Sequence, residues 1–166
     1  LNMWCDAQLT PATTIYSNTK GAIQVSDASK AELCNLSLSS PKNGIQAGMG
    51  AYLNIRNITI TNSQGDGISL WGAKGQIDNA TITGSSNAGI RLNNGFLSIR
   101  NSTISGSTKG GISSHQQSAI NLNGGVIIEN NGYGIGMHNS TLFQYDNEPS
   151  YIRSNTGYEI KAHMST

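Results

Sequence analysis

Three histidines, His115, His138 and His163, are the residues whose type and spacing most directly suggest chemistry. They are all the histidines of the chain, and they recur at nearly regular intervals in its second half. Neutral imidazole is the commonest side-chain ligand of transition metals, so imidazoles about 5 Å apart on neighbouring strands could share a divalent ion. No carboxylate or cysteine recurs with them, and a stacked polar edge is the alternative interpretation. The three are candidate metal ligands, and no cofactor is expected.

A second group, Trp71, Arg91, Asn93 and His115, has the composition of a sugar-binding strip. An exposed indole can cover the face of a pyranose ring, while guanidinium, amide and imidazole groups hydrogen-bond to its hydroxyls. The alternative is an indole that only covers the edge of a sheet. We take these four residues as candidate glycan-binding residues.

The acidic residues offer little for catalysis. Glycosidases need two carboxylates about 5–5.5 Å apart when retaining, or about 6.5–9.5 Å apart when inverting. The close acidic pair, Asp146 and Glu148, lies in a turn-like insertion, and Asp66 stands alone in a glycine-rich turn. No nucleophile elbow, phosphate loop or zinc motif is present. Asp146 and Glu148 are therefore weak catalytic candidates, and the sequence favours a non-enzymatic role.

The elements that must position these residues are repeats of 22 residues. Asn35, Asn57, Asn79 and Asn101 open similar phrases, such as Asn-Ile-Thr-Ile-Thr. Pairs of aliphatic anchors, eight apart in all but Leu38/Ile45, extend the pattern to both ends: Ile15/Ile23, Leu38/Ile45, Ile60/Ile68, Ile82/Ile90, Ile104/Ile112, Ile127/Ile135 and Ile152/Ile160. Alternating apolar and polar residues indicate half-buried strands, which at this period bury a face only by stacking. The prediction is an all-β, right-handed parallel β-helix solenoid of about seven coils.

Stacking converts equivalent positions into columns. One outward column holds Ser26, Gly48, Trp71, Asn93 and then the three histidines. A charged column of Arg56, Asp78 and Arg100 is expected to help set the register, and the arginines to lower the pKa of Asp78. Two hydroxyl-rich columns could match an ice lattice, or could reflect only the strand preference of threonine: Thr14, Ser37, Thr59, Thr81, Thr103 and Tyr16, Ser39, Thr61, Thr83, Ser105.

Two phrases, Asn57-Ile-Thr-Ile-Thr-Asn with Gly67-Ile-Ser-Leu and Asn79-Ala-Thr-Ile-Thr with Gly89-Ile-Arg-Leu, resemble the right-handed parallel β-helix repeat superfamily. This superfamily includes pectate-lyase-like proteins and bacteriophage tailspikes. The resemblance covers residues 13–164, which we assign to one β-helix domain, with residues 1–12 as an N-terminal lead-in or cap.

The resemblance implies a structural or adhesive module of a tailspike-, fibre- or decoration-like virion protein that contacts host surface glycans. Such a module would form a homotrimer or be joined to flanking domains, in a virion or at a cell surface. A polysaccharide-degrading lyase or glycosidase fragment, an ice-binding solenoid and a surface adhesin are the alternatives.

Composition excludes two further classes of partner. Charged residues make up 11% of the chain and the net charge is +1, so there is no basic stripe for nucleic acid. No apolar run approaches the roughly 20 residues that span a bilayer, so no membrane insertion is expected. Cys5 and Cys34 do not define a disulfide framework; free thiols are the favoured prediction, and a bond between them is the alternative.

Overall fold

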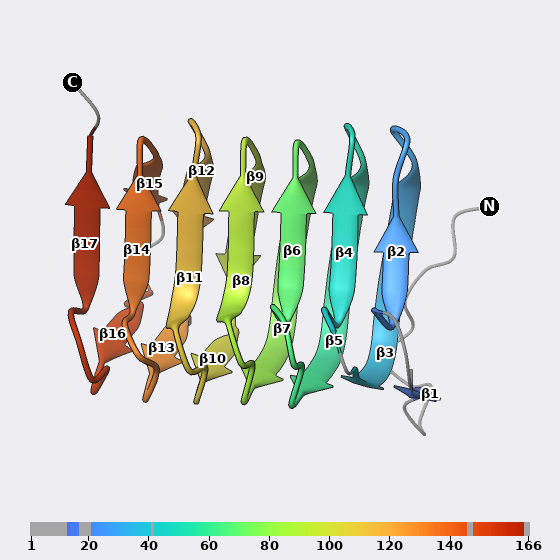
Figure 1. The fold of residues 1–166 in the computed structure, drawn as a ribbon, viewed down its shortest axis with the longest axis horizontal. Coiled ribbons are helices and arrows are strands. Elements are labelled where there is room, and N and C mark those ends of the chain that lie inside the picture. Colours follow the sequence, from blue (N-terminus) through green and yellow to red (C-terminus); the bar gives the residue numbers. More distant parts are fainter. Residues whose placement is uncertain (1–12, 17–20, 41, 146–147, 165–166) are drawn as a thin grey trace.

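The computed structural model describes residues 13–16, 21–40, 42–145 and 148–164. Every element in these ranges is a β-strand, and the strands stack in parallel, one coil upon the next (Figure 1). The predicted all-β parallel β-helix is therefore confirmed. Within the described part of the chain, no helix is long and apolar enough to cross a membrane.

One face of the solenoid, here called the β2–β17 face, is a sheet of seven strands. They are hydrogen-bonded in the order β17, β14, β11, β8, β6, β4, β2, and all are visible in Figure 1. Their bounds are β2 (Ile23–Val25), β4 (Ile45–Gly48), β6 (Ile68–Trp71), β8 (Ala88–Asn93), β11 (Gly110–His115), β14 (Ile135–His138) and β17 (Ile160–His163).

The remaining strands form a second sheet that bends into two faces. The β3–β15 face consists of the first halves of β3 (Lys30–Ser39), β5 (Tyr52–Thr61) and β7 (Lys74–Thr83), followed by β9 (Phe96–Arg100), β12 (Ala119–Leu122) and β15 (Thr141–Gln144). The β1–β16 face consists of β1 (Thr13–Tyr16), the second halves of the same three long strands, β10 (Thr103–Ser105), β13 (Ile127–Glu129) and β16 (Tyr151–Arg153).

The repeated asparagines stand at the bend between these two faces. Asn35, Asn57, Asn79 and Asn101 have φ angles of 53°, 52°, 55° and 48°. Asparagine enters this left-handed region more readily than most residues. Its amide also links the coils: Asn57 Nδ2 donates to Asn35 Oδ1 at 3.1 Å, and Asn79 Nδ2 donates to Asn57 Oδ1 at 2.7 Å. The asparagine repeat thus encodes a turn in each coil and, from Asn35 to Asn79, a hydrogen-bonded ladder; Asn101 Nδ2 donates instead to Asp78 Oδ1 at 3.3 Å.

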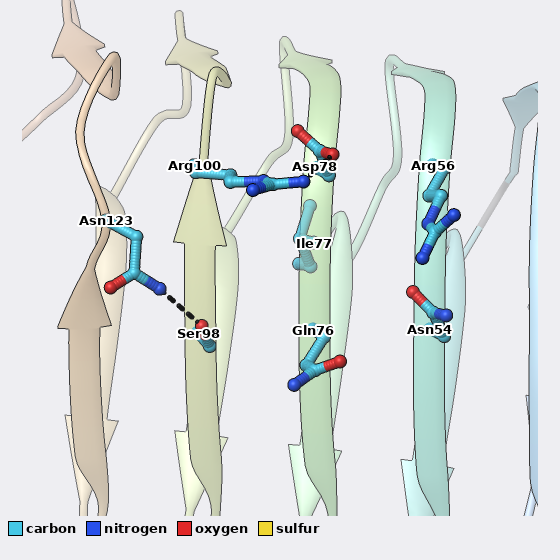
Figure 2. Close-up of a pocket in the computed structure, with 8 residues that line it drawn as sticks. All are labelled: Asn54, Arg56, Gln76, Ile77, Asp78, Ser98, Arg100 and Asn123. Carbon is cyan, nitrogen blue, oxygen red and sulfur yellow. Dashed lines mark hydrogen bonds and ion pairs between the residues drawn. The ribbon is translucent and has the colours of Figure 1, made fainter.

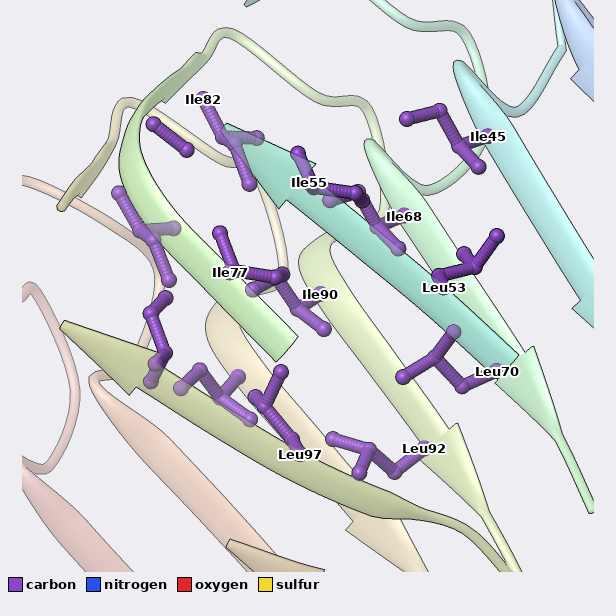
Figure 3. Packing of buried hydrophobic residues seen from close by; sticks show 14 of the residues in the cluster. Ile45, Leu53, Ile55, Ile68, Leu70, Ile77, Ile82, Ile90, Leu92 and Leu97 are labelled. Carbon is purple, nitrogen blue, oxygen red and sulfur yellow. The ribbon is translucent and has the colours of Figure 1, made fainter. Parts of the chain in front are cut away.

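The core is a stack of aliphatic side chains that point inward from all three faces (Figure 3). The column of Leu33, Ile55, Ile77 and Ile99 continues in register to Leu122. Ile55 and Ile99 are fully buried. Because inward residues alternate with outward ones along each strand, a core of this kind fixes which side chains face solvent.

The predicted anchor pair Ile127/Ile135 is wrong by one residue. Ile104 pairs with Ile128, which in turn pairs with Ile152. Ile128 is buried, whereas Ile127 continues the outward threonine column opposite Thr103. The segment between β10 and β13 is longer than in the earlier coils, and a one-residue shift moves a strand side chain to the opposite face.

The prediction of free thiols is also wrong for Cys34, which is disulfide-bonded. The other cysteine of the sequence, Cys5, and the proposed lead-in of residues 1–12 lie outside the described residues. A disulfide needs Cβ atoms roughly 3.5–4.5 Å apart, a condition that the spacing of two cysteines in a sequence does not reveal.

Candidate functional site

The predicted outward column exists on the β2–β17 face. Trp71 pairs with Asn93, and Asn93 pairs with His115 on the next coil. Arg91 lies on the same strand as Asn93, two residues earlier, and its side chain also faces outward because the buried Leu92 separates them. The fold therefore brings together Trp71, Arg91, Asn93 and His115, which we call the β2–β17 strip.

Trp71 forms the aromatic end of the strip. It ends β6, and it is 52% exposed, which is unusual for so large an apolar side chain. Its indole Nε1 donates to Ser69 Oγ at 3.1 Å, and Ser69 is an outward residue on the same strand. This hydrogen bond fixes the indole on the sheet surface while leaving much of its apolar surface in contact with solvent.

Arg91 is held in place by a buried carboxylate. Its Nε lies 3.0 Å from Asp66 Oδ2, and the side chains are 31% and 7% exposed respectively. Asp66 Oδ1 also accepts a hydrogen bond from the backbone N–H of Ala88 at 3.1 Å, and the Asp66 N–H donates to Asn43 Oδ1 at 2.9 Å. Asp66 is therefore not a solitary turn residue, as the sequence suggested, but the support of Arg91.

His115 is the second polar group of the strip and is uncharged at neutral pH. Partial burial, and after it the positive charges of Arg91 and His138, lower the pKa of His115 from its usual 6.5. Its Nε2 is 3.0 Å from Ser113 Oγ, so one ring nitrogen has a partner on the same strand. A neutral imidazole can donate from one ring nitrogen and accept at the other.

The histidine column keeps its register through the last coils. His115 pairs with His138, and His138 pairs with His163. The ring centroids are 6.3 Å apart in the first pair, which is stacked, and 6.4 Å apart in the second, which is tilted. No group of three or more His, Cys, Asp or Glu among the described residues is placed to hold a metal ion. The three imidazoles follow one another in a row along the sheet, and metal binding by them stays a prediction.

A polar corner extends the strip and was not anticipated from the sequence. Asn94, Gln116, Gln117 and Asn139 line an open hollow of about 560 Å³. Asn94, Gln116 and Asn139 directly follow Asn93, His115 and His138, and all four lining residues have positive φ angles. The sequence does hold a signal for this corner, because Asn93, His115 and His138 are each followed by an asparagine or a glutamine. Together with the strip, the corner forms one continuous surface of hydrogen-bonding groups.

Glu148, one of the two weak catalytic candidates, is not brought to this surface. Glu148 is exposed in the loop between β15 and β16, whereas the strip is carried by β6, β8 and β11. Asp146 lies outside the described residues. A catalytic role for the two acids stays a prediction.

The hydroxyl and charged columns have the predicted register. Ser37, Thr59, Thr81 and Thr103 are successive partners on the β1–β16 face, and the row ends at Ile127. An ice-binding role for this row stays a prediction. On the β3–β15 face, Arg56 pairs with Asp78 and Asp78 with Arg100, as the charge pattern indicated.

Comparison with known proteins agrees with this architecture. Residues 8–165 match the family described as the right handed beta helix region, and the chain belongs to that family. The fold is similar to the crystal structure of the periplasmic alginate epimerase AlgG, with a TM-score of 0.73, 14% sequence identity, and coverage of 82% of this chain and 38% of that one. A point mutant of the same epimerase gives a TM-score of 0.68, 14% identity, and coverage of 93% and 38%.

This chain therefore spans about 38% of the length of those two structures. No curated protein matches it.

Proposed function

We propose that this protein is a polysaccharide-binding β-helix module that works outside the cytoplasm and contacts glycans through the β2–β17 strip. The observation that carries the proposal is the alignment of the exposed indole of Trp71 with Asn93 and His115 on successive coils, beside the ion-paired Arg91. Two coil steps of about 4.8 Å give the strip a length that suits a short oligosaccharide.

The chemistry of the strip supports sugar recognition. The indole offers an apolar surface to a pyranose ring, and the amide and the neutral imidazole can exchange hydrogen bonds with its hydroxyls. Arg91 is ion-paired with Asp66 through Nε, and the N–H donors on its two terminal nitrogens remain for a ligand. Because Asp66 holds Arg91 and Ser69 holds Trp71, little side-chain ordering is required on binding, which favours affinity.

Two observations support a location outside the cytoplasm. Cys34 is disulfide-bonded, and disulfides persist mainly in oxidising compartments. The AlgG structures that share the fold are those of a periplasmic enzyme that acts on a polysaccharide, alginate.

Substitution of Trp71 tests the strip. Binding to alginate and to a panel of bacterial surface polysaccharides is measured by isothermal titration calorimetry for the wild type, Trp71→Ala and Trp71→Phe. We expect Trp71→Ala to weaken binding at least tenfold, about 1.4 kcal/mol, and Trp71→Phe to weaken it less. Tyr145→Ala removes another exposed aromatic ring, on a different part of the surface, and should leave the affinity unchanged. Equal affinities for Trp71→Ala and wild type would refute the proposal.

If the protein is part of a virion, it is expected to form an oligomer. A tailspike- or fibre-like module is expected to be a trimer, with a mass three times the 17.5 kDa of one chain. Absolute mass by light scattering separates it from a solitary binding module. A monomer would argue against the tailspike assignment and favour an adhesin, without affecting the glycan-binding strip.

Catalysis on the bound polysaccharide is a second candidate function, and the position of His115 near Arg91 on adjacent strands of the strip favours it. A neutral imidazole beside a guanidinium can accept a proton from a ligand held on the same face. Incubation with alginate, followed by NMR of the sugar protons, tests this role. Product formation that His115→Gln abolishes while binding persists would support it, and an unchanged polymer would contradict it.

A further inference from the structure

The β3–β15 face contains a polar groove that the β2–β17 strip does not use. It has a volume of about 290 Å³ and lies across β5, β7 and β9 (Figure 2). Small-molecule pockets begin at roughly 300 Å³, so this hollow suits one small polar unit. The side chains that matter most are Asn54, Arg56, Gln76, Asp78, Ser98 and Arg100.

Two arginines and one carboxylate give the groove an excess of one positive charge. Arg100 Nη2 lies 2.7 Å from Asp78 Oδ2, so these two charges are paired. Arg56 stands beside Asp78 in register on the preceding coil, yet no ion pair joins it to an acidic residue in the described part of the chain. In Figure 2 its guanidinium points along the groove toward Asn54.

The ion pair between Asp78 and Arg100 fixes the charge and position of these two side chains at one side of the groove. Burial tends to raise the pKa of Asp78, but hydrogen bonds from Arg100 and Asn101 and the charges of Arg100 and Arg56 outweigh it and leave that pKa below 3.8. Asp78 therefore stays ionised at neutral pH and keeps Arg100 in place. Arg56 is exposed and has no ion pair with an acidic residue in the described part of the chain, so a ligand can approach its guanidinium.

Neutral hydrogen-bonding groups line the rest of the groove. Within the described part of the chain, no hydrogen bond joins the amide of Asn54 or of Gln76 to another side chain. At the far side, Asn123 Nδ2 donates to Ser98 Oγ at 2.6 Å, which leaves the Ser98 hydroxyl able to donate its own proton. Amides and a hydroxyl around a cation match the hydroxyls that surround a carboxylate on an acidic sugar.

We propose that this groove is a second binding site, selective for a sugar unit that carries a carboxylate, with Arg56 as its anchor. The guanidinium of Arg56 receives the carboxylate through two parallel N–H donors, a geometry that a lysine or an amide cannot reproduce. Asn54 and Gln76 bind the ring hydroxyls, and Ser98 closes the far side. The site is on a different face from the β2–β17 strip and does not depend on it.

Titration with sodium glucuronate tests the site, with glucose as the matched neutral sugar. Binding is followed by two-dimensional ¹⁵N NMR of wild type, Arg56→Gln, Lys109→Gln and Trp71→Ala. Lys109→Gln removes the same charge from an exposed turn and controls for the change in net charge. Melting curves show that each variant is folded, as expected for substitutions of exposed side chains.

We expect glucuronate to shift the amide signals of β5, β7 and β9, and Arg56→Gln to weaken this binding at least fivefold. Lys109→Gln should bind glucuronate as the wild type does, and Trp71→Ala should leave the shifts of β5, β7 and β9 unchanged. Equal shifts with glucose, or unchanged affinity in Arg56→Gln, would overturn the proposal. Sodium sulfate that competes as well as glucuronate would overturn its sugar part and leave only an anion site. Because Trp71→Ala tests the other face, the two proposals fail independently.

Discussion

Replacement of Gly67 by alanine tests why a glycine precedes the second aliphatic anchor of the repeats. A Cβ at Gly67 would lie 2.6 Å from the carbonyl oxygen of Gly89 on the next coil and 2.6 Å from Ile82 Cγ2. The carbonyl belongs to the backbone, and the branched side chain of the buried Ile82 is stiff at χ1, so neither neighbour gives way easily. Gly48 offers a matched control, since a Cβ there would approach only Trp71 O, at 3.7 Å.

Overpacking of a well-packed core costs about 1–3 kcal/mol, and this collision lies at the upper end. Alanine also restricts the unfolded chain more than glycine does, which stabilises the folded state by about 0.4–1 kcal/mol. We therefore expect Gly67→Ala to lower the free energy of unfolding by about 2 kcal/mol. For a chain of this length the Tm should fall by about 4–8 °C. Gly48→Ala should be neutral or slightly stabilising. Urea denaturation and calorimetry measure both variants, and equal stabilities of the two would refute this explanation of the glycine column.

Three further predictions concern charge, pH and the disulfide. Asp66→Asn keeps the oxygen that accepts the hydrogen bond from Ala88 but removes the negative charge beside Arg91. Urea denaturation should show that the free energy of unfolding falls by about 1–2 kcal/mol. Calorimetry should show that the strip binds glycans more weakly. Folding lowers the pKa of His115, so the unfolded state binds more protons than the folded state as the pH falls below 6.5. The free energy of unfolding should therefore decrease in this pH range. Melting curves recorded across it should show a smaller decrease for His115→Gln than for the wild type. Reduction of the Cys34 disulfide should remove about 2–4 kcal/mol, seen as a lower Tm in dithiothreitol; an unchanged Tm would contradict its contribution.

Much of the candidate site was predictable because, in a solenoid, residues one repeat apart in the sequence lie next to each other on adjacent coils. Residues about one period apart must stack, so the repeat alone predicted that Trp71, Asn93, His115 and His138 share one column. The Arg56–Asp78–Arg100 column followed in the same way. Alternation along each strand then indicated which of these side chains face solvent.

Interactions across corners could not be read in this way. Asp66 lies in a turn and reaches Arg91 on the next coil, and the path of a turn does not follow from strand alternation. The disulfide of Cys34 likewise depends on which part of the chain comes close to it in space. The position of the aliphatic anchor at Ile128 depends on the length of the segment between β10 and β13.

The sequence by itself therefore determined the parallel β-helix, the stacking of its columns and the faces on which they lie, because the hydrophobic period and the asparagine turns repeat along the chain. Only the tertiary structure decided that Asp66 supports Arg91, that no ion pair joins Arg56 to an acidic residue among the described residues, and that polar side chains enclose a groove on the β3–β15 face. These features depend on side-chain directions and turn paths, which short-range alternation does not specify.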